Sequence, residues 1–211
     1  MRAASLAGHE DAACRLVTLS RRERVSRLRL LPDRLRSLAA GLLMRRCLGV
    51  RSDADLRLGP MGRPELALTG PSFSVSHAGD FAALALSVRG PVGLDLESLD
   101  RKVRRGLVAD RTFSPEERGF LEGRPDDPLP FLSVWTRKES LVKAAGLGIF
   151  EGAGDFSVVP LDAPVFHALG SAWNLATATR DGHVFSVSVP YEEDAPLRLE
   201  LLEVRAADLM E

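Results

Sequence analysis

The feature that most constrains the fold is the order of helix-like and strand-like patterns along the 211 residues. Residues 20–50 carry apolar side chains at helical spacing, and residues 73–100 change to the pattern of short strands joined by turns. Helical spacing returns over residues 113–145, and strand-like segments follow at 156–160, 173–180, 183–190 and 197–204. A helix-then-strands order that occurs twice predicts the α+β class, with two similar small units, residues 1–100 and 101–211, packed together.

The first helical region is expected to form two helices. Ser20 is a candidate N-cap, with Glu23 three residues later as in a capping box. Pro32 interrupts the pattern, and Asp33 is expected to open the second helix, which Gly49 ends. The apolar stripe of the second helix consists of Leu35, Leu38, Leu42 and Leu43.

The second helical region carries clearer boundary signals. Ser114 is expected to cap a helix that has Pro115 at its first position and Glu117 at its third. A longer helix is expected over residues 129–145, ended by Gly146. The sequence TRDGHV at residues 179–184 is typical of a hairpin turn between two strands.

The charge of the chain is unevenly distributed. The formal net charge is −1, but residues 1–51 hold twelve arginines and only four acidic residues. A basic segment attached to an acidic body favours an anionic ligand, although a solvated helix face explains such a run about equally well. The sequence contains no apolar run of membrane-spanning length and no secretory leader, and Cys14 and Cys47 are too few for a disulfide framework. These observations predict reduced thiols and a cytoplasmic location.

Two carboxylates in the sequence VGLDLE are spaced for metal binding. Asp95 and Glu97 lie two residues apart, so on a strand they share one face while Leu94 and Leu96 point into the core. Two carboxylates held together repel each other unless a cation lies between them, and hard oxygen ligands suit Mg²⁺. A solvated acidic edge strand is the alternative for so short a motif.

The sequence WTRKESLVKAAGLG, residues 135–148, adds a third carboxylate. Trp135, Glu139 and Lys143 recur every four residues and therefore form one stripe of a helix. An exposed Glu139–Lys143 ion pair is the simpler explanation, but a tryptophan on the same stripe indicates partial burial. The chain has 28 basic residues, of which only Lys102, Lys138 and Lys143 are lysines, so two neighbouring lysines here suggest a need for a compact charge.

The sequence SVSHAGD places two hydrogen-bonding side chains at the end of a strand. Ser76 and His77 can both donate to a phosphate. A Ser–His nucleophile pair is the alternative, but adjacent strand residues point to opposite sides and no G-x-S-x-G motif is present. A capping serine and a structural histidine would explain the motif in isolation.

In order and spacing, these motifs resemble the 4′-phosphopantetheinyl transferases of the surfactin-synthetase-activator type. The resemblance rests on DRLRSLAAGLLMR, GRP, SVSHAGD, VGLDLE, FSPEE and WTRKESLVKAAGLG, and it covers about residues 20–148. It implies a pseudo-dimer of two similar α+β halves with the site in a cleft between them. It implies Asp95, Glu97 and Glu139 as ligands of Mg²⁺ or Mn²⁺, and Arg36, Arg63, Ser76 and His77 at the nucleotide end of coenzyme A.

The resemblance also implies the reaction and the partners. A serine of an acyl, peptidyl or aryl carrier protein would attack coenzyme A, with Glu139, Asp95 and Lys143 as the catalytic residues and 3′,5′-ADP as the product. Lys143 would contact the phosphate next to the metal, Lys138 would support the site less directly, and Trp135 would pack the helix in place. We expect a monomer without nucleic-acid or membrane partners. The sequence departs from the family pattern at Arg63, Leu96 and Ser140, none of which is an expected metal ligand.

Two rival functions remain at this level. An arginine-rich helical segment could dock on nucleic acid, although no RRM, KH or zinc signature is present and the pI is near 6.5. A metal-dependent phosphohydrolase would use the same carboxylates with water as the nucleophile. The apolar residues Phe113, Phe120 and Leu121 fit either a docking patch for a carrier protein or the core, and their helical spacing favours the core.

Overall fold

The structure is a computed structural model that describes residues 1–59, 62–102, 105–124, 127–148, 153–163, 165–194, 197 and 199–210. The chain forms two compact units. Unit 1 comprises Met1–Pro71, Val75–Leu84 and Glu200–Glu211, and unit 2 comprises Ser72–Ser74 and Ala85–Leu199. The α+β class is confirmed, whereas the internal similarity of two halves divided near residue 100 stays a prediction.

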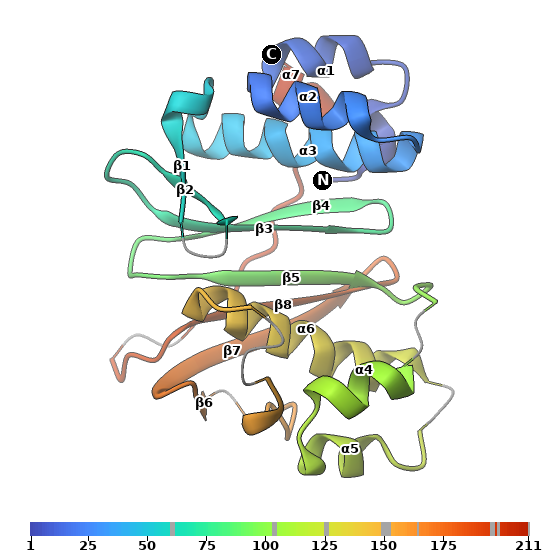
Figure 1. Ribbon diagram of the computed structural model, residues 1–211, viewed down its shortest axis with the longest axis vertical. Helices are drawn as coiled ribbons and strands as arrows, with labels where there is room; N and C mark the ends of the chain where they lie inside the picture. Colours follow the sequence, from blue (N-terminus) through green and yellow to red (C-terminus); the bar gives the residue numbers. More distant parts are fainter. Residues whose placement is uncertain are drawn as a thin grey trace. The chain divides into compact units, whose positions relative to one another are not determined.

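Unit 1 is built around one long buried helix (Figure 1). The helices α1 (Glu10–Leu16), α2 (Leu19–Arg27) and α7 (Ala206–Met210) surround α3 (Leu31–Leu48), together with a short 3₁₀ turn at Ala3–Leu6. The predicted stripe of α3 is confirmed, because Leu35, Leu38, Leu42 and Leu43 are all buried. Gly49 ends the helix with φ = 72°, a left-handed conformation that glycine adopts without strain.

Two starts of helices differ from the sequence-based expectation. Thr18, not Ser20, precedes α2, and neither residue caps the helix through its side chain. The hydroxyl of Ser20 instead contacts the carboxylate of Asp53, on the short 3₁₀ turn Asp53–Asp55. Helix α3 begins at Leu31 rather than Asp33, since proline lacks only an N–H that the first turn does not use and Pro32 is therefore accommodated there.

Two small sheets accompany the helices. Strands β1 (Leu56–Leu58) and β2 (Pro64–Leu66) form an antiparallel pair. Strands β3 (Ser72–Ala78) and β4 (Phe81–Ser87) form a second two-stranded sheet, and residues of both strands are assigned to each unit. The inner residues of β3 and β4 belong to unit 1, where Val75, Leu84 and Ala82 pack with the core around α3.

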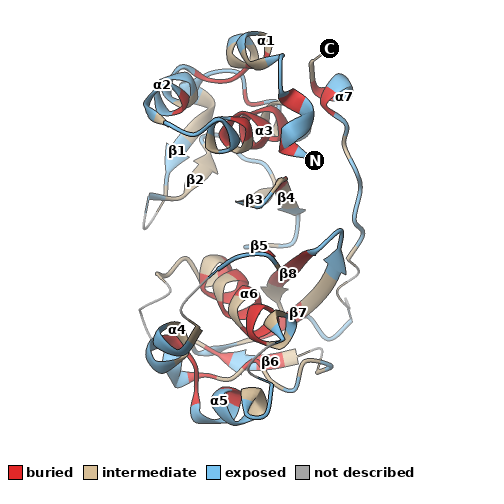
Figure 2. Ribbon diagram, turned by 90° about the vertical axis from the view of Figure 1, so that its right-hand side faces the viewer, coloured by how far each residue is buried: buried red, intermediate tan, exposed pale blue. Residues whose placement is uncertain are grey.

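Unit 2 is a four-stranded antiparallel sheet covered by a helix (Figures 1 and 2). The strand order is β5 (Gly93–Ser98), β8 (His183–Pro190), β7 (Ser171–Arg180) and β6 (Val165–Ala168). Helix α6 (Pro128–Ala145) packs on β5, β8 and β7, and two shorter helices, α4 (Arg105–Thr112) and α5 (Pro115–Leu121), lie beside it. The predicted 179–184 turn is confirmed, with Asp181 and Gly182 both at positive φ.

The structure confirms the predicted helix cap at Ser114 but not two of the predicted strands. The cap at Ser114 is confirmed, because its hydroxyl accepts from the N–H of Glu117. Residues 156–160 and the described residues among 197–204 are not strands. Both segments have apolar residues in alternation, but neither pairs with the sheet; the first places Phe156 and Val158 in the core below α6. The apolar residues proposed as a docking patch belong to the core, since Phe113 is buried and Phe120 and Leu121 pack against it.

Candidate functional site

One face of β5 brings the predicted carboxylates to α6. Gly93, Asp95 and Glu97 alternate along the strand, and each of them contacts α6. The helix approaches β5 so closely at Gly93 that a Cβ there would overlap the carbonyl oxygen of Ser140. Asp95 and Glu97 are 5% and 8% exposed, so the carboxylates are buried between the strand and the helix rather than solvated.

Each of these two carboxylates is neutralised by groups of the chain itself. The ammonium of Lys143 donates to Asp95 Oδ1 at 2.6 Å. Glu97 forms an ion pair with Arg101 and accepts a hydrogen bond of 3.3 Å from the indole N–H of Trp135. Trp135 therefore packs beside the site and also holds one of its carboxylates, which extends the packing role predicted for it.

Glu139 faces the same place from the helix. Burial raises the pKa of its carboxyl group, the charges of Lys143 and Arg101 lower it, and the charge of Asp95 raises it further. These influences place Glu139 within electrostatic reach of Asp95, as the predicted set of three carboxylates requires. A carboxylate with a raised pKa is a better proton acceptor at neutral pH.

The donor set matches a hard divalent cation in its chemistry, with three carboxylates from one strand face and the helix facing it. In the described part of the chain, however, no three carboxylate, imidazole or thiolate side chains are grouped so that they could hold a metal ion as they stand. Lys143 and Arg101 are instead paired with Asp95 and Glu97. The buried pairs show that this position requires a counter-charge, which a bound ion would also supply.

Lys138, which was expected to support the site indirectly, is fully buried on another face of α6. Its ammonium forms an ion pair of 2.7 Å with Glu117 and donates to the carbonyl of Phe156, also at 2.7 Å. Burial lowers the pKa of Lys138 and raises that of Glu117, and each charge opposes the shift of the other. The sequence predicted Glu117 as part of the helix start at Ser114, but it gave no indication of the ion pair between Glu117 and Lys138.

Ser140, which departs from the family pattern, has a clear role in packing. Its hydroxyl donates to the carbonyl of Arg137 at 2.8 Å and lies 2.7 Å from the hydroxyl of Ser188 on β8. Thr136 makes the equivalent contact to Ser186 at 2.8 Å. Small hydroxyl side chains on both surfaces allow α6 to lie close to the sheet.

Unit 1 contains all four residues predicted to bind the nucleotide end of coenzyme A, which are Arg36, Arg63, Ser76 and His77. His77 is exposed to solvent on β3, but neighbouring atoms remove part of the hydration of its ring, and this lowers its pKa. The charges of Arg36, Arg24 and Arg21 lower the pKa further. Arg36 is fixed by its contacts to the carbonyl of Gly79 at 2.6 Å and to Asp33. Arg36 and His77 are thus brought together, and we call these two residues with Arg21 and Arg24 the arginine cluster.

The other two predicted residues are Arg63 and Ser76. Arg63 directly precedes β2, where burial lowers its pKa and the carboxylate of Glu65 opposes that shift. Ser76 is buried beside His77 on β3, on the opposite side of the strand. Sequence reasoning missed Arg21 and Arg24, which were visible only as members of a generally arginine-rich helix.

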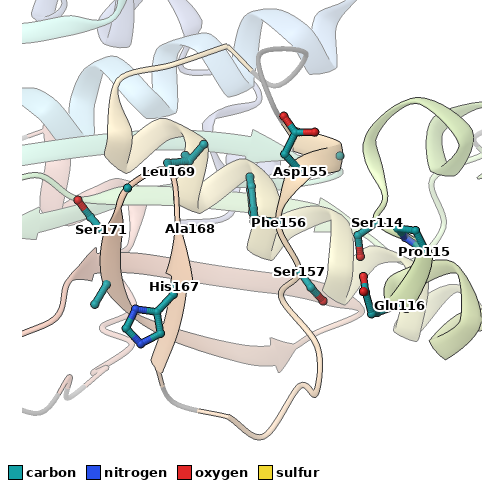
Figure 3. A pocket seen from close by; sticks show the side chains of 13 residues that line it. Ser114, Pro115, Glu116, Asp155, Phe156, Ser157, His167, Ala168, Leu169 and Ser171 are labelled. Atoms are coloured by element: carbon teal, nitrogen blue, oxygen red, sulfur yellow. The ribbon is translucent and has the colours of Figure 1, made fainter.

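A cavity of about 720 Å³ in unit 2 contains none of the predicted site residues (Figure 3). One side is formed by Ser114, Pro115 and Glu116 and another by residues 154–157, with His167 and Leu169 of the β6–β7 hairpin completing it.

Among the described helices, none has both the length and the hydropathy needed to cross a bilayer.

Comparison with known proteins identifies the family of the chain. The sequence model of the 4′-phosphopantetheinyl transferase superfamily matches residues 91–193, which include β5 and α6. A 4′-phosphopantetheinyl transferase of Bacillus subtilis is 31% identical over 162 residues, which are 72% of this chain and 70% of that protein. The transferase AcpT of Salmonella typhimurium is 32% identical over 128 residues, 59% of this chain and 67% of the relative.

The structure has an α+β fold, and these relatives identify the class of enzyme as a transferase. The chain belongs to the 4′-phosphopantetheinyl transferase superfamily and is an enzyme of that class. The match to a relative from Synechocystis sp. is 38% identical over 100 residues, and it spans 44% of this chain but only 40% of that protein.

Proposed function

We propose that the chain transfers the 4′-phosphopantetheine group of coenzyme A to a serine of an acyl, peptidyl or aryl carrier protein. The serine Oγ forms a bond to the β-phosphorus, the bridging P–O bond breaks, and 3′,5′-ADP leaves. The observation that carries this proposal is the group of buried Asp95 and Glu97 with half-buried Glu139 and Lys143, which combines anionic and cationic side chains of β5 and α6. Such a transfer depends mostly on positioning and on charge neutralisation.

The roles of the four residues follow from their chemistry. Glu139 accepts the proton of the attacking serine hydroxyl, a role that its raised pKa supports. Asp95, Glu97 and Glu139 would hold Mg²⁺ or Mn²⁺, and a bound ion of this kind neutralises charge on a diphosphate. Lys143, which is only half-buried, has its ammonium beside Asp95 and is available to contact a phosphate oxygen.

The arginine cluster would bind the nucleotide end of the substrate. Arg36, Arg21 and Arg24 offer guanidinium donors to the 3′-phosphate, and His77 adds an imidazole whose charge depends on its surroundings. Arg63 and Ser76 keep the nucleotide-binding role suggested by the family resemblance. We propose that the carrier protein is acidic, because the basic amino-terminal segment would attract an acidic surface. We also propose that the enzyme is a cytoplasmic monomer that acts without nucleic-acid or membrane partners.

Mass spectrometry of an apo carrier protein incubated with the chain, coenzyme A and Mg²⁺ tests the proposal. We expect an adduct of ~340 Da, the mass of a phosphopantetheine group held covalently on the acceptor serine. The matched control is the same carrier protein with its acceptor serine replaced by alanine, which should gain no mass. A phosphohydrolase would release phosphopantetheine from coenzyme A and leave both carrier proteins unmodified, and that result would refute the transferase.

A further inference from the structure

Four consecutive residues of α6 make contacts on different sides of the helix. Thr136 contacts Ser186 of β8. Arg137 donates to the carbonyls of Leu161 and Ala163 at 2.8 and 3.4 Å. These two contacts, and those of the next two residues, follow from the turn of about 100° per residue in a helix.

The next two residues of α6 complete the set. Lys138 pairs with Glu117, whereas Glu139 lies one helical turn before Lys143, whose ammonium donates to Asp95 of β5. Three sides of the helix are therefore fixed by buried polar contacts, and the fourth presents the proposed catalytic carboxylate.

The contact on the Lys138 side has the most partners. Lys138 donates to Glu117 at 2.8 Å and to the carbonyl of Phe156 at 2.7 Å, with its ammonium 4.2 Å from the centre of the Phe156 ring. Glu117 also accepts from the backbone N–H groups of Ser114 at 2.8 Å and Val158 at 2.9 Å. We call Lys138, Glu117 and these three backbone partners the buried hub.

The buried hub joins α6 to two segments that otherwise border a cavity. Residues 114–116 and residues 154–157 form facing parts of the cavity wall (Figure 3). Glu117 is bonded to Ser114 of the first segment and to Val158, which directly follows the second, whereas Lys138 is bonded to Phe156 of the second segment. Both side chains are 0% exposed. The hub therefore supplies direct contacts between α5, residues 156–158 and α6 at the residue that precedes Glu139.

We propose that Lys138 and Glu117 are positioning residues for Glu139. They fix the rotation and the axial position of α6 in unit 2, and so fix where the carboxylate of Glu139 lies relative to Asp95. This inference rests on the proposed function of Glu139. Misplacing a reacting group by about 1 Å can cost about 10²-fold in rate, so modest freedom of the helix would be costly.

The choice of an ion pair supports positioning over stabilisation. Two buried charges lose hydration, and apolar residues of similar volume often stabilise a core as well or better. Apolar contacts, however, tolerate sliding and rotation, whereas each of the hub's hydrogen bonds has a defined direction and length. A pair that serves only stability can be replaced by uncharged side chains without loss of activity, but a positioning pair cannot.

The test compares three variants with the wild-type chain: Lys138→Met, Glu117→Gln and the double variant. Each single variant leaves one buried charge without its partner and is expected to lower the melting temperature. The double variant removes both charges while keeping nearly the same volumes, and it keeps the protein folded should a single variant fail to fold. Trp173→Phe is the control, because it removes a buried hydrogen bond to the carbonyl of Ala168 at the far edge of the sheet.

We measure kcat, the KM for coenzyme A, the binding of Mn²⁺ by electron paramagnetic resonance and hydrogen exchange of the amides of α6. For the double variant we expect kcat to fall about 10- to 100-fold, KM to change less than about threefold and Mn²⁺ to bind more weakly. Hydrogen exchange around Glu139 should accelerate in the double variant but not in Trp173→Phe. The control should keep the wild-type kcat even where its melting temperature is lowered.

Wild-type kcat, Mn²⁺ binding and α6 exchange in a folded double variant would overturn the positioning role. Failure of the proposed function has a different signature, because the wild-type chain itself would then form no carrier adduct. In that case faster exchange at Glu139 in the double variant, with the control unchanged, would still support the positioning of this residue by the hub, and unchanged exchange would refute it.

Discussion

The two units handle charge in opposite ways. In unit 2 the candidate carboxylates Asp95 and Glu97 are almost fully buried, and they form ion pairs with Lys143 and Arg101. In unit 1 the arginine cluster includes an exposed histidine, His77, whose pKa is lowered first by lost hydration of its ring and then by the charges of Arg36, Arg24 and Arg21. Buried, paired groups act through geometry, whereas exposed groups of like charge act mainly through their summed attraction for an anion.

This difference leads to a kinetic expectation. Changes in unit 2 should affect the rate of the chemical step, because preorganised charge is worth most where water is excluded. Changes in the arginine cluster should affect the binding of coenzyme A, since exposed contacts are screened and partly replaceable.

Replacing the proposed base should give the largest effect. In Glu139→Gln the side chain keeps its size but no longer accepts a proton, and we expect transfer to fall at least about 10³-fold with the melting temperature preserved. The rate is measured by the mass shift of the carrier protein over time. Glu122→Gln, a change at an exposed carboxylate after α5, is the matched control and should keep wild-type activity. Full activity in Glu139→Gln would contradict the role of Glu139 as the base, and with it the expectation that unit 2 governs the chemical step.

Removing one cation from the arginine cluster should give a smaller effect of a different kind. In Arg36→Ala a guanidinium is lost and Asp33 is left without its partner, so the KM for coenzyme A should rise about tenfold while kcat changes less than about threefold. Arg34→Ala, on the same helix, removes contacts to two backbone carbonyls only and should leave KM unchanged. Steady-state kinetics at saturating carrier protein distinguishes the two outcomes. A fall in kcat alone would assign Arg36 to the chemistry.

The smallest effect concerns pH. Lost hydration of the ring and the charges of Arg36, Arg24 and Arg21 lower the pKa of His77 in the free protein, whereas a bound phosphate would raise that pKa. Binding of 3′,5′-ADP should therefore take up a proton and strengthen by about two- to threefold as the pH falls through the interval between these two pKa values.

Calorimetry from pH 8 to pH 5.5 provides the measurement for His77. The phosphate itself titrates near pH 6, so the comparison is made with His77→Gln, which retains a hydrogen-bond donor but cannot titrate. The part of the pH dependence that is absent from His77→Gln is assigned to the imidazole. Identical profiles in the two proteins would show that His77 does not sense the anion.

Local signals predicted much of the fold. The left-handed cap at Gly49, the capping box at Ser114 and the turn at Asp181 are decided by a few neighbouring residues, and all three were readable from the sequence. The errors occur where a distant partner decides. Ser20 has the composition of an N-cap, but its hydroxyl contacts Asp53 on a later turn, which no local pattern reveals.

The candidate site shows the same division. The spacing of Asp95 and Glu97, and of Trp135, Glu139 and Lys143, correctly predicts which side chains share a face. The sequence does not reveal that these faces are turned toward each other and buried, because that depends on the close contact of α6 with β5 at Gly93. Neither could the buried pair of Lys138 and Glu117 be deduced, since their separation of 21 residues corresponds to no helical or strand period.

The position of α7 has a consequence for how the protein is made. Ala206 and Leu209 belong to the hydrophobic core that surrounds α3, although more than 150 residues separate them from that helix. A ribosome makes the chain in the order of its sequence, so this core lacks Ala206 and Leu209 until strands β5 to β8 have been made. The sheet that carries the carboxylates therefore has these strands available before the helices of unit 1 acquire α7 as a neighbour.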